Sequence, residues 1–376
     1  MRVLIDLLPA TNLSARHVLL GHLTQLSRRA FGGHEYIVLF HKKNRDVQID
    51  LGPAVKWIEC PVYTSHWFAR YVWEYTRMPA LVKSLKIDLL FNISGGVLPF
   101  VKIPQITYAM NPLPLIRGIN RSLMTRIKEA LQRRSYRYAM KKAEIMLFLS
   151  EYMQKEFRLN AGFVERRSKV VYAGLDDDVY RDAEEYKENC TRDPFRIISV
   201  SVMTYHKNIE TLLKAVHLIK KDRGIQPELF LAGPWASAEY RKKIDRILDI
   251  LELRKGVVVA GQVSREDLHR LYASSKVFCL MSKCESFGIP AVEAQAFGTP
   301  VVSSNCCAIP EVCGEGGIYL DPDDAEGVAR EIYRLLTDPV SWEKLSTAAR
   351  DNASKYKWDD CAKSLMKILE PGKSFR

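Results

Sequence analysis

Two glutamates flank the start of a short predicted helix near residue 290. Glu285 lies before a turn that contains Gly288, Pro290 suits the first position of a helix, and we expect Glu293 in the first helical turn. Carboxylates accept hydrogen bonds from neighbouring hydroxyls such as those of a ribose or a hexose. The two residues are therefore predicted to hold two parts of one ligand. The alternative is purely structural, a capping acid and a Glu that the helix dipole stabilises.

The main chain between the glutamates predicts an anion site. Residues 277–281 read as a strand, and the N–H groups of Ser286, Phe287, Gly288 and Ile289 then lie at the start of the helix. Helix N-termini bind phosphate because their first N–H groups have no partner within the helix. The segment thus predicts a phosphorylated ligand that is rich in hydroxyl groups.

The surrounding chain alternates short apolar strands with helical segments. In the first half, strands are predicted at 2–8, 35–40, 88–92, 105–108 and 145–149, with helices at 16–29, 71–85 and 120–142. In the second half, strands are predicted at 196–201, 229–232, 256–260, 277–281, 300–303 and 317–320, with helices at 208–221, 238–251, 265–273, 290–297, 325–337 and 341–356. This alternation predicts an α/β protein with doubly wound parallel sheets, whose ligands bind at the carboxyl ends of the strands.

The polar, acidic stretch 176–193 contains no apolar strand and predicts a domain boundary. Because 376 residues exceed what one core usually holds, we expect two domains, 1–185 and 193–356, with a C-terminal helix 357–376 that returns to the first. Within that boundary the run Asp176-Asp177-Asp178 is interpreted as a turn in a solvated linker, since blocks of like charge usually face solvent.

The composition is that of a soluble globular enzyme, with 47% hydrophobic and 27% charged residues. No apolar run approaches the ~18 residues that span a membrane, and the start of the chain does not resemble a signal peptide. We therefore expect a cytoplasmic protein. Its eight cysteines have no CxxC spacing, which predicts buried free thiols.

Positive charge is concentrated in the first 150 residues, which hold 22 Lys and Arg against 9 Asp and Glu, whereas the remainder holds 34 against 35. The predicted helix 120–142 interleaves eight of these cations with apolar residues. Such a helix suits peripheral contact with an anionic membrane or a lipid-linked acceptor, although a basic face without a partner and ordinary packing on a sheet are the alternatives. A nearby aromatic cluster is expected in the core. It comprises Trp67, Phe68, Tyr71, Trp73 and Tyr75.

Residues 284–302 resemble the two-glutamate signature of glycosyltransferase family 4, whose members have the GT-B fold of two Rossmann-like domains facing each other across a cleft. Other stretches resemble the family in the same order along the chain. They are residues 150–157, 171–176, His206-Lys207-Asn208, Gly261-Gln262-Val263 with the following helix, residues 309–312 and Trp358. The resemblance is strong across 145–370 and looser before 145.

The resemblance implies a retaining glycosyltransferase of the hexosyltransferase type that needs neither a cofactor nor a divalent metal. Such an enzyme moves a sugar from a nucleotide diphosphate sugar to a hydroxyl of a glycan or lipid-linked acceptor, in the synthesis of cell-surface polysaccharide or glycoconjugate. Lys207 and Glu285 would be catalytic, with Lys207 beside the donor diphosphate and Glu285 on the transferred sugar. By the same resemblance, the N-terminal domain would bind the acceptor and the C-terminal domain the donor.

The remaining donor contacts are also implied by the resemblance. Glu293 would bind the ribose, Gly261 and Val263 would lie against the base with Gln262 in the same loop, and the main chain of residues 286–289 would contact the phosphates or the sugar. Val202 stands where the family usually has an arginine, five residues before Lys207.

His206 is expected to supply part of the missing charge or a hydrogen bond to the phosphate, or else to cap the helix start. On the acceptor side, Ser14 and Ala15 stand in place of a glycine pair. Met110 or Asn111 occupies the place of a histidine of the first domain, so a side-chain base is not expected there.

Two other functions fit parts of the pattern. A sugar-nucleotide epimerase of the same fold would cleave the same anomeric bond without an acceptor. A basic nucleic-acid-binding protein would need aromatic and basic residues interleaved along one groove, and it would leave residues 285–302 without a purpose. We therefore expect a nucleotide sugar and an acceptor as partners, and no nucleic acid.

Overall fold

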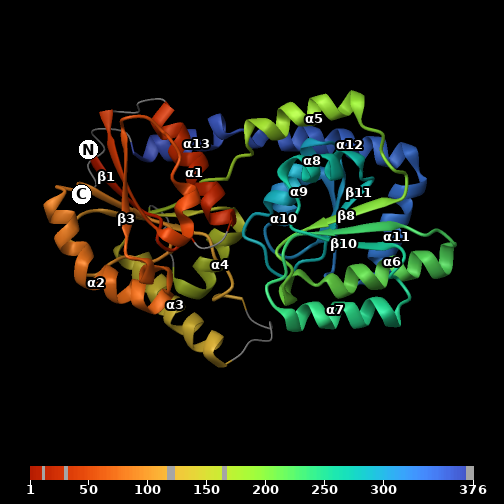
Figure 1. The fold of residues 1–376 in the computed structure, drawn as a ribbon, viewed down its shortest axis with the longest axis horizontal. Coiled ribbons are helices and arrows are strands. Elements are labelled where there is room, and N and C mark those ends of the chain that lie inside the picture. Colours follow the sequence, from red (N-terminus) through yellow and green to blue (C-terminus); the bar gives the residue numbers. More distant parts are fainter. Residues whose placement is uncertain (11–12, 29–32, 117–122, 163–166, 370–376) are drawn as a thin grey trace. The chain divides into compact units, whose positions relative to one another are not determined.

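A computed structural model describes residues 1–10, 13–28, 33–116, 123–162 and 167–369 (Figure 1). The chain forms two compact units. The first comprises Met1–Gly174 and the C-terminal segment from Trp358, and the second comprises Leu175–Lys357. Each is an α/β domain built on one parallel sheet.

The first unit alternates strands and helices along most of its length. Its strands are β1 (Arg2–Asp6), β2 (Glu35–His41), β3 (Val55–Cys60), β4 (Leu89–Asn92), β5 (Gln105–Ala109), β6 (Ile145–Phe148) and β7 (Ser168–Val170). Its α-helices are α1 (Leu13–Arg28), α2 (Trp67–Ser84), α3 (Leu123–Lys142), α4 (Glu151–Ala161) and α13 (Trp358–Ile368). Short 3-10 helices occupy Lys42–Val47 and Val62–Ser65.

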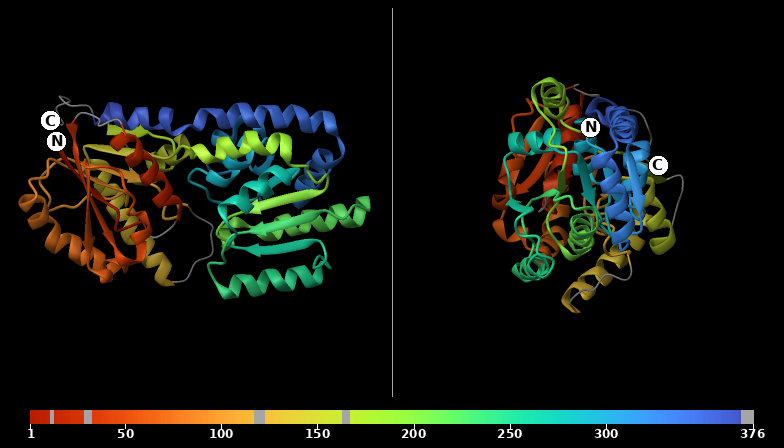
Figure 2. Two further views of the ribbon diagram at one scale, coloured as in Figure 1. Left: turned by 45° about the horizontal axis from the view of Figure 1, so that its top comes forward. Right: turned by 90° about the vertical axis from the view of Figure 1, so that its right-hand side faces the viewer.

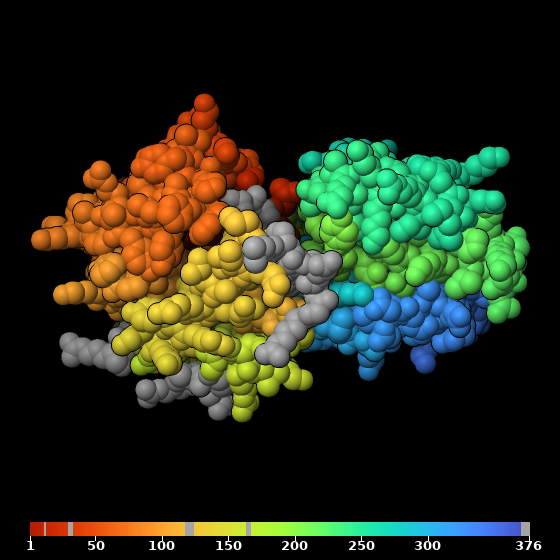
Figure 3. Space-filling model, turned by 90° about the horizontal axis from the view of Figure 1, so that it is seen from below, coloured from red at the N-terminus to blue at the C-terminus, as the bar shows by residue number. Residues whose placement is uncertain are grey.

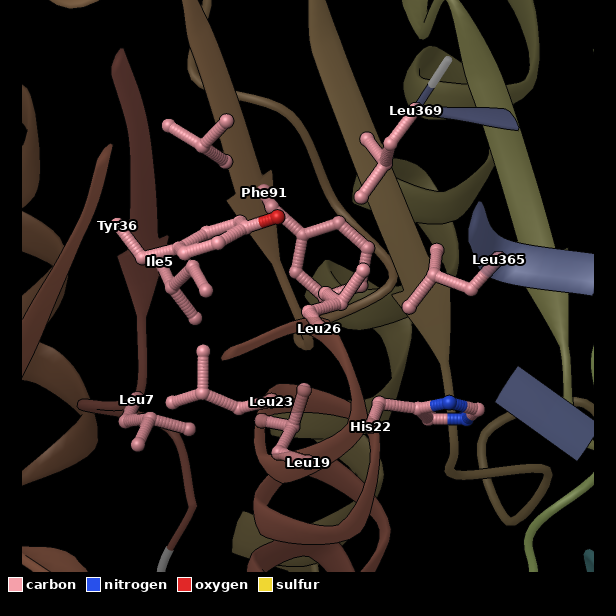
Figure 4. Close-up of a pocket in the computed structure, with 11 residues that line it drawn as sticks. Ile5, Leu7, Leu19, His22, Leu23, Leu26, Tyr36, Phe91, Leu365 and Leu369 are labelled. Atoms are coloured by element: carbon pink, nitrogen blue, oxygen red, sulfur yellow. The ribbon is translucent and has the colours of Figure 1, made fainter. Parts of the chain in front are cut away.

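The first sheet has the order β3-β2-β1-β4-β5-β6-β7, and its described strand pairs are parallel. Val3 and Ile5 of β1 face α1 and α13. Together with Leu365 they line a small apolar cavity, and none of the predicted site residues is part of its lining (Figure 4). Leu4 points to the opposite core, against Met78 of α2. Because successive side chains of a strand alternate between faces, this sheet is covered by helices on both sides.

The second unit repeats the same plan. Its strands are β8 (Arg196–Val200), β9 (Glu228–Ala232), β10 (Val257–Gly261), β11 (Val277–Leu280), β12 (Val301–Ser304) and β13 (Gly317–Leu320). Its α-helices are α5 (Asp177–Asn189), α6 (Ile209–Arg223), α7 (Ala238–Ile250), α8 (Arg265–Ser274), α9 (Ile289–Ala296), α10 (Ile309–Cys313), α11 (Ala325–Thr337) and α12 (Pro339–Ala353). The 3-10 helices are Tyr205–Lys207, Gly314–Gly316 and Ser354–Tyr356.

The second sheet has the order β10-β9-β8-β11-β12-β13, again with parallel neighbours. Helices α6, α7 and α11 cover one face, and α5, α8, α9 and α12 lie over the other (Figures 1 and 2). This order is that of a Rossmann-like sheet, so the prediction of two doubly wound α/β domains is confirmed.

The second unit begins at Leu175, whereas the sequence placed the end of the first domain at residue 185. The acidic stretch forms helix α5 rather than a linker, because Val179 is buried and the helix packs on α8 and α9. Asp177 and Asp178 lie in its first turn, where the helix dipole favours acidic side chains. Helix α13 packs on α1 in the first unit. Residue 29, residues 120–122 and residues 370–376, which belong to three predicted helices, lie outside the described residues.

Candidate active site

The second sheet reverses its direction of winding between the neighbouring strands β8 and β11. The chain continues from β8 to β9 on one side and from β11 to β12 on the other. Open α/β sheets bind ligands in the crevice that such a reversal leaves beyond the carboxyl ends of the strands. The two loops that follow these strands carry Lys207 and Glu285, the residues predicted to be catalytic.

Lys207 and Glu285 form an ion pair in this crevice. The Nζ atom of Lys207 donates a hydrogen bond to Oε1 of Glu285, although 78 residues separate them in the chain. Their side chains are only 13% and 12% exposed, so solvent and salt screen the pair less than they would a surface pair. An ammonium group has three donors and a carboxylate has two oxygens. Both groups therefore keep capacity for a ligand while they hold each other in place.

The loop after β8 is tied to the loop after β11 through its main chain. The carbonyl of His206 accepts hydrogen bonds from the N–H of Lys283 at 2.8 Å and from the hydroxyl of Ser282 at 3.2 Å. The hydroxyl of Thr204 lies 3.0 Å from Nδ1 of His206. Asn208, not His206, is the N-cap residue of α6.

The turn into α9 requires a glycine. Gly288 is the N-cap residue and has a left-handed φ of 96°, and a β-carbon there would lie 2.2 Å from Cδ1 of Ile309. The predicted phosphate-binding stretch lies directly at this helix start: Ser286 and Ile289 are half-buried, and Phe287 and Gly288 are buried. The local sequence therefore folds as predicted, with Gly298 at φ 69° just after the helix.

Glu293 lies in the second turn of α9. The prediction that it lies in the first turn is wrong, because the helix already begins at Ile289. It is 7% exposed, and its Oε2 atom accepts a hydrogen bond from the hydroxyl of Tyr272 at 3.0 Å. Burial and the charge of Glu293 raise the pKa of Tyr272 well above its usual value, so the phenol stays a donor. Tyr272 of α8 thus fixes the carboxylate, a role that the sequence did not reveal.

The predicted base-binding loop follows β10 at the same edge of the sheet. Gly261 has a left-handed φ of 65°, and among the described residues, apart from its two chain neighbours, no atom lies within 4 Å of the place where its β-carbon would be. Gln262 is exposed and Val263 is half-buried. The hydroxyl of Ser264 then accepts from the N–H of Asp267 at 3.1 Å and caps α8. The loop therefore offers open space beside its main chain.

The acidic run at the start of α5 is engaged by Arg265 of α8. The guanidinium contacts Asp178 at 2.5 Å and Asp176 at 3.0 Å. Burial disfavours the charge of Asp178, but the hydrogen bonds and charge of Arg265 prevail and lower its pKa. The run is thus a paired helix start and not the solvated linker that the sequence predicted.

The predicted acceptor-side residues lie at strand ends of the first unit. Ser14 is exposed and Ala15 is buried, both in the first turn of α1 after β1, whereas Met110 and Asn111 are half-buried and follow β5. Because β4 separates β1 from β5, these pairs do not follow neighbouring strands. The Oδ1 atom of Asn111 accepts from the N–H of Leu113 at 3.1 Å, so this side chain shapes its own turn.

A buried acidic pair at the end of β1 was not singled out from the sequence. Asp6 and Glu74 are 3% and 8% exposed, and Nε of Arg70 lies 3.3 Å from Oε1 of Glu74. Burial raises the pKa of both carboxyl groups above their usual values. The spacing of Arg70 and Glu74 by one helical turn was the available signal. Because Asp6 is the last residue of β1, Asp6 and Glu74 lie at the carboxyl edge of the first sheet.

Part of the chain is similar to known glycosyltransferases. Residues 181–356 match the family model of glycosyl transferases group 1. O-antigen chain mannosyltransferase B of Escherichia coli is 35% identical over 167 residues, which are 43% of this chain and 42% of that protein. MMP alpha-(1->4)-mannosyltransferase of Mycolicibacterium hassiacum is 29% identical over 206 residues, 54% of this chain and 47% of that protein. The matches thus span about half the length of these curated relatives.

The fold resembles solved structures over nearly the whole chain. HepE of Anabaena, crystallised with UDP and glucose, has a TM-score of 0.75 at 17% identity, covering 98% of this chain and 99% of that one. With its two Rossmann-like parallel-sheet domains, the chain therefore has the α/β architecture of GT-B proteins, and residues 181–356 are similar to the glycosyl transferases group 1.

Proposed function

We propose that this protein is a glycosyltransferase that moves a hexose from a nucleotide diphosphate sugar to a hydroxyl of a glycan or lipid-linked acceptor. The observation that carries this proposal is the contact between Lys207 and Glu285 at the switch point of the second sheet. Two relatives are named mannosyltransferases, and HepE was crystallised with UDP and glucose. Mannose and glucose are therefore the first sugars to test, and polysaccharide or glycoconjugate synthesis is the proposed setting.

In the proposed reaction, the bond between the anomeric carbon and the diphosphate oxygen breaks, and its electron pair leaves with the nucleoside diphosphate. The acceptor oxygen bonds to the same carbon and gives its proton to the departing diphosphate, and we propose that the anomeric configuration is retained. Lys207 neutralises the charge that grows on the diphosphate, and the N–H groups of residues 286–289 bind it. Glu285 holds the transferred sugar through its hydroxyls. No metal is needed in this scheme because Lys207 supplies the positive charge.

The remaining donor contacts follow the same edge of the sheet. Glu293, which Tyr272 holds in place, binds the ribose, and Gly261, Gln262 and Val263 lie against the base. The open space beside Gly261 supports this placement, because a flat ring needs close approach to the main chain. His206 contributes a hydrogen bond to the phosphate. In the first unit, Ser14, Ala15, Met110 and Asn111 belong to the acceptor side.

We also propose that α3 rests on the inner, anionic face of a membrane. Met124, Ile127, Leu131 and Tyr138 are 72%, 49%, 53% and 38% exposed, and their spacing places them along one stripe of the helix. A helix that merely packed on the sheet would bury such a stripe. The same helix carries seven Lys and Arg, and its one acidic residue, Glu129, is buried. Apolar side chains among cations suit a bilayer with anionic lipids.

The exposed stripe continues onto α2. Trp67, Phe68 and Tyr71 are 37%, 58% and 49% exposed, so the expected burial of this aromatic cluster is wrong for these three residues. The rings of Tyr71 and Tyr75 lie 4.2 Å apart, and burial, the hydrogen bond with Tyr71 and, to a smaller extent, Tyr138 of α3 raise the pKa of Tyr75. Figure 3 views the face of the first unit on which α3 (yellow) and α2 (orange) meet. Large exposed apolar patches usually mark an interaction site.

No helix within the described residues is long and apolar enough to cross a bilayer. Contact through the α2 and α3 patch would therefore be peripheral. It would bring the first unit to the surface that holds a lipid-linked acceptor. A nucleic acid could also attract the cations of α3, but it gives no reason for the exposed aliphatic side chains between them.

The function is tested by incubating the protein with UDP, GDP, ADP and dTDP sugars, with and without glycan and lipid-linked acceptors. We expect donor consumption only when an acceptor is present, a product with the donor's anomeric configuration by nuclear magnetic resonance, and equal rates in the presence of a chelator. Donor epimerisation without an acceptor would establish the epimerase alternative instead. Binding to nucleic acid but to no nucleotide sugar would overturn the proposal.

A further inference from the structure

Two adjacent cysteines follow β12, next to the proposed donor site. The Sγ atoms of Cys306 and Cys307 lie 3.7 Å and 4.0 Å from the carbonyl oxygen of Ser282, which belongs to the loop that carries Glu285. The N–H of Ala308 donates to the carbonyl of Glu285 at 3.3 Å. The two loops are therefore in direct contact, and the thiols lie at their junction.

Cys306 differs from most of the other cysteines in its environment. It is half-buried, whereas Cys307 is 8% exposed, and of the remaining six only Cys190 is not buried. A hydrogen bond from Cys307 lowers the pKa of Cys306 to about 7, while burial raises the pKa of Cys279 and Cys313 above the usual range. The thiolate is the reactive form of cysteine. The pair thus combines an accessible, reactive sulfur with a second thiol beside it.

We propose that Cys306 and Cys307 form a modification site, a dithiol that small-molecule disulfides oxidise to an intramolecular disulfide, and that this oxidation suppresses sugar transfer. The part that concerns transfer rests on the proposed function. Thiols that respond to oxidants are often accessible, have a low pKa and lie next to a resolving cysteine. Because adjacent Cα atoms lie about 3.8 Å apart, closer than the ~4.4–6.8 Å of ordinary disulfides, a bond between Cys306 and Cys307 is strained.

The chemistry balances with a disulfide such as oxidised glutathione as the oxidant. The Cys306 thiolate attacks one sulfur of glutathione disulfide, forms a mixed disulfide and releases one glutathione thiolate. The Cys307 thiol loses its proton and attacks the sulfur of Cys306, which releases the second glutathione. The protein loses two electrons and two protons, and the oxidant takes them up as two thiols.

The new bond would disturb the loop that contacts Glu285. A disulfide brings the two sulfurs to about 2.05 Å, fixes the torsion angle between them and removes both S–H donors, so neither sulfur can donate a hydrogen bond to the Ser282 carbonyl. Cys307 already has a left-handed φ of 69°, which is strained for a residue with a side chain. A shift there is passed on to Ala308, which bonds Glu285, and to Ile309, which packs against Gly288.

The test compares the wild-type protein with Cys306→Ser and with Cys190→Ser, which removes the other cysteine that is not buried. Each is exposed to glutathione disulfide and examined by intact mass, peptide mapping and transfer assay. We expect the wild type and Cys190→Ser to lose the mass of two hydrogens, mapped to Cys306 and Cys307. Their transfer rates should fall ~100-fold, the scale of a ~1 Å misplacement, and dithiothreitol should restore them. Cys306→Ser should keep its activity. Alkylation of Cys306 should accelerate as the pH rises through about 7.

Three results would overturn the inference. They are inactivation of Cys306→Ser to the same extent as the wild type, a glutathione adduct on Cys306 that never resolves to the disulfide, and a complete disulfide with unchanged transfer. The mass readout does not depend on catalysis. If the untreated protein transferred no sugar, the proposed function would fail, and the effect of oxidation would be measured on nucleoside diphosphate binding instead.

Discussion

The two Rossmann-like units share the order of six strands, to which the first sheet adds β7, but they present different chemistry. At the switch point of the second sheet, Lys207 and Glu285 meet on loops after neighbouring strands. At the end of β1 in the first sheet, the carboxyl groups of Asp6 and Glu74 are buried with raised pKa values, and the cationic excess lies instead on outer elements such as α3. One fold can serve two purposes, because function resides in the site and not in the architecture. We propose that the chemistry takes place in the second unit and surface recognition in the first.

Replacing Glu285 with glutamine would sharpen this comparison most. The variant keeps the size of the side chain and hydrogen bonding but removes the charge that Lys207 pairs with, so we expect turnover to fall by ~100-fold or more. The fold should be unchanged, so the circular dichroism spectrum of the variant should match that of the wild type. Near-normal turnover would show that the chemistry does not depend on this carboxylate.

Glu293→Ala is expected to have a smaller effect, on binding rather than on turnover. Its proposed partner is a ribose hydroxyl that substrate and product share, so the dissociation constant of the nucleoside diphosphate should rise by ~10-fold, the loss of about one charged hydrogen bond. The matched variant is Tyr272→Phe, which keeps the Glu293 carboxylate but removes the hydroxyl that donates a hydrogen bond to it. It should weaken nucleoside diphosphate binding less than Glu293→Ala does. Unchanged affinity in Glu293→Ala would remove it from the donor site.

The smallest effect is expected on the first unit. Ile127→Asp places a charge in the middle of the exposed stripe of α3 and should reduce binding to vesicles of anionic phospholipid several-fold, without altering transfer to a soluble acceptor. Leu159→Asp is the control, because Leu159 is 69% exposed on α4, outside the patch. A specific role of α3 would be contradicted if Ile127→Asp bound vesicles as well as the wild type, or if Leu159→Asp lost as much binding as Ile127→Asp.

The fold was largely predictable because most strands are apolar runs bounded by turns. The strand β3 was missed because Lys56 and Glu59 interrupt its apolar pattern at the edge of the sheet. Helix α5 was missed because Val179 is its only buried residue, so its acidic composition resembled a linker. Apolar periodicity alone also could not reveal that the stripe on α3 faces outward, since the same pattern serves a buried helix.

The candidate site was predictable residue by residue but not as an assembly. The turn at Gly288 follows from local sequence, because a glycine two residues before a proline is typical of a helix start. The contact between Lys207 and Glu285 depends on two strands being neighbours, which the topology determines and the local pattern does not. For the same reason the hydroxyl of Tyr272 on Glu293 appeared only in the structure.

The most direct test of the account is the transfer rate of Lys207→Ala. Val202 is 44% exposed where a second cation was expected, so Lys207 should be nearly indispensable for neutralising the diphosphate. We predict that Lys207→Ala almost abolishes transfer, that Lys221→Ala on the exposed side of α6 does not, and that adding Val202→Arg to Lys207→Ala restores part of the rate. Full activity in Lys207→Ala would contradict the central claim that this lysine and Glu285 form the catalytic centre.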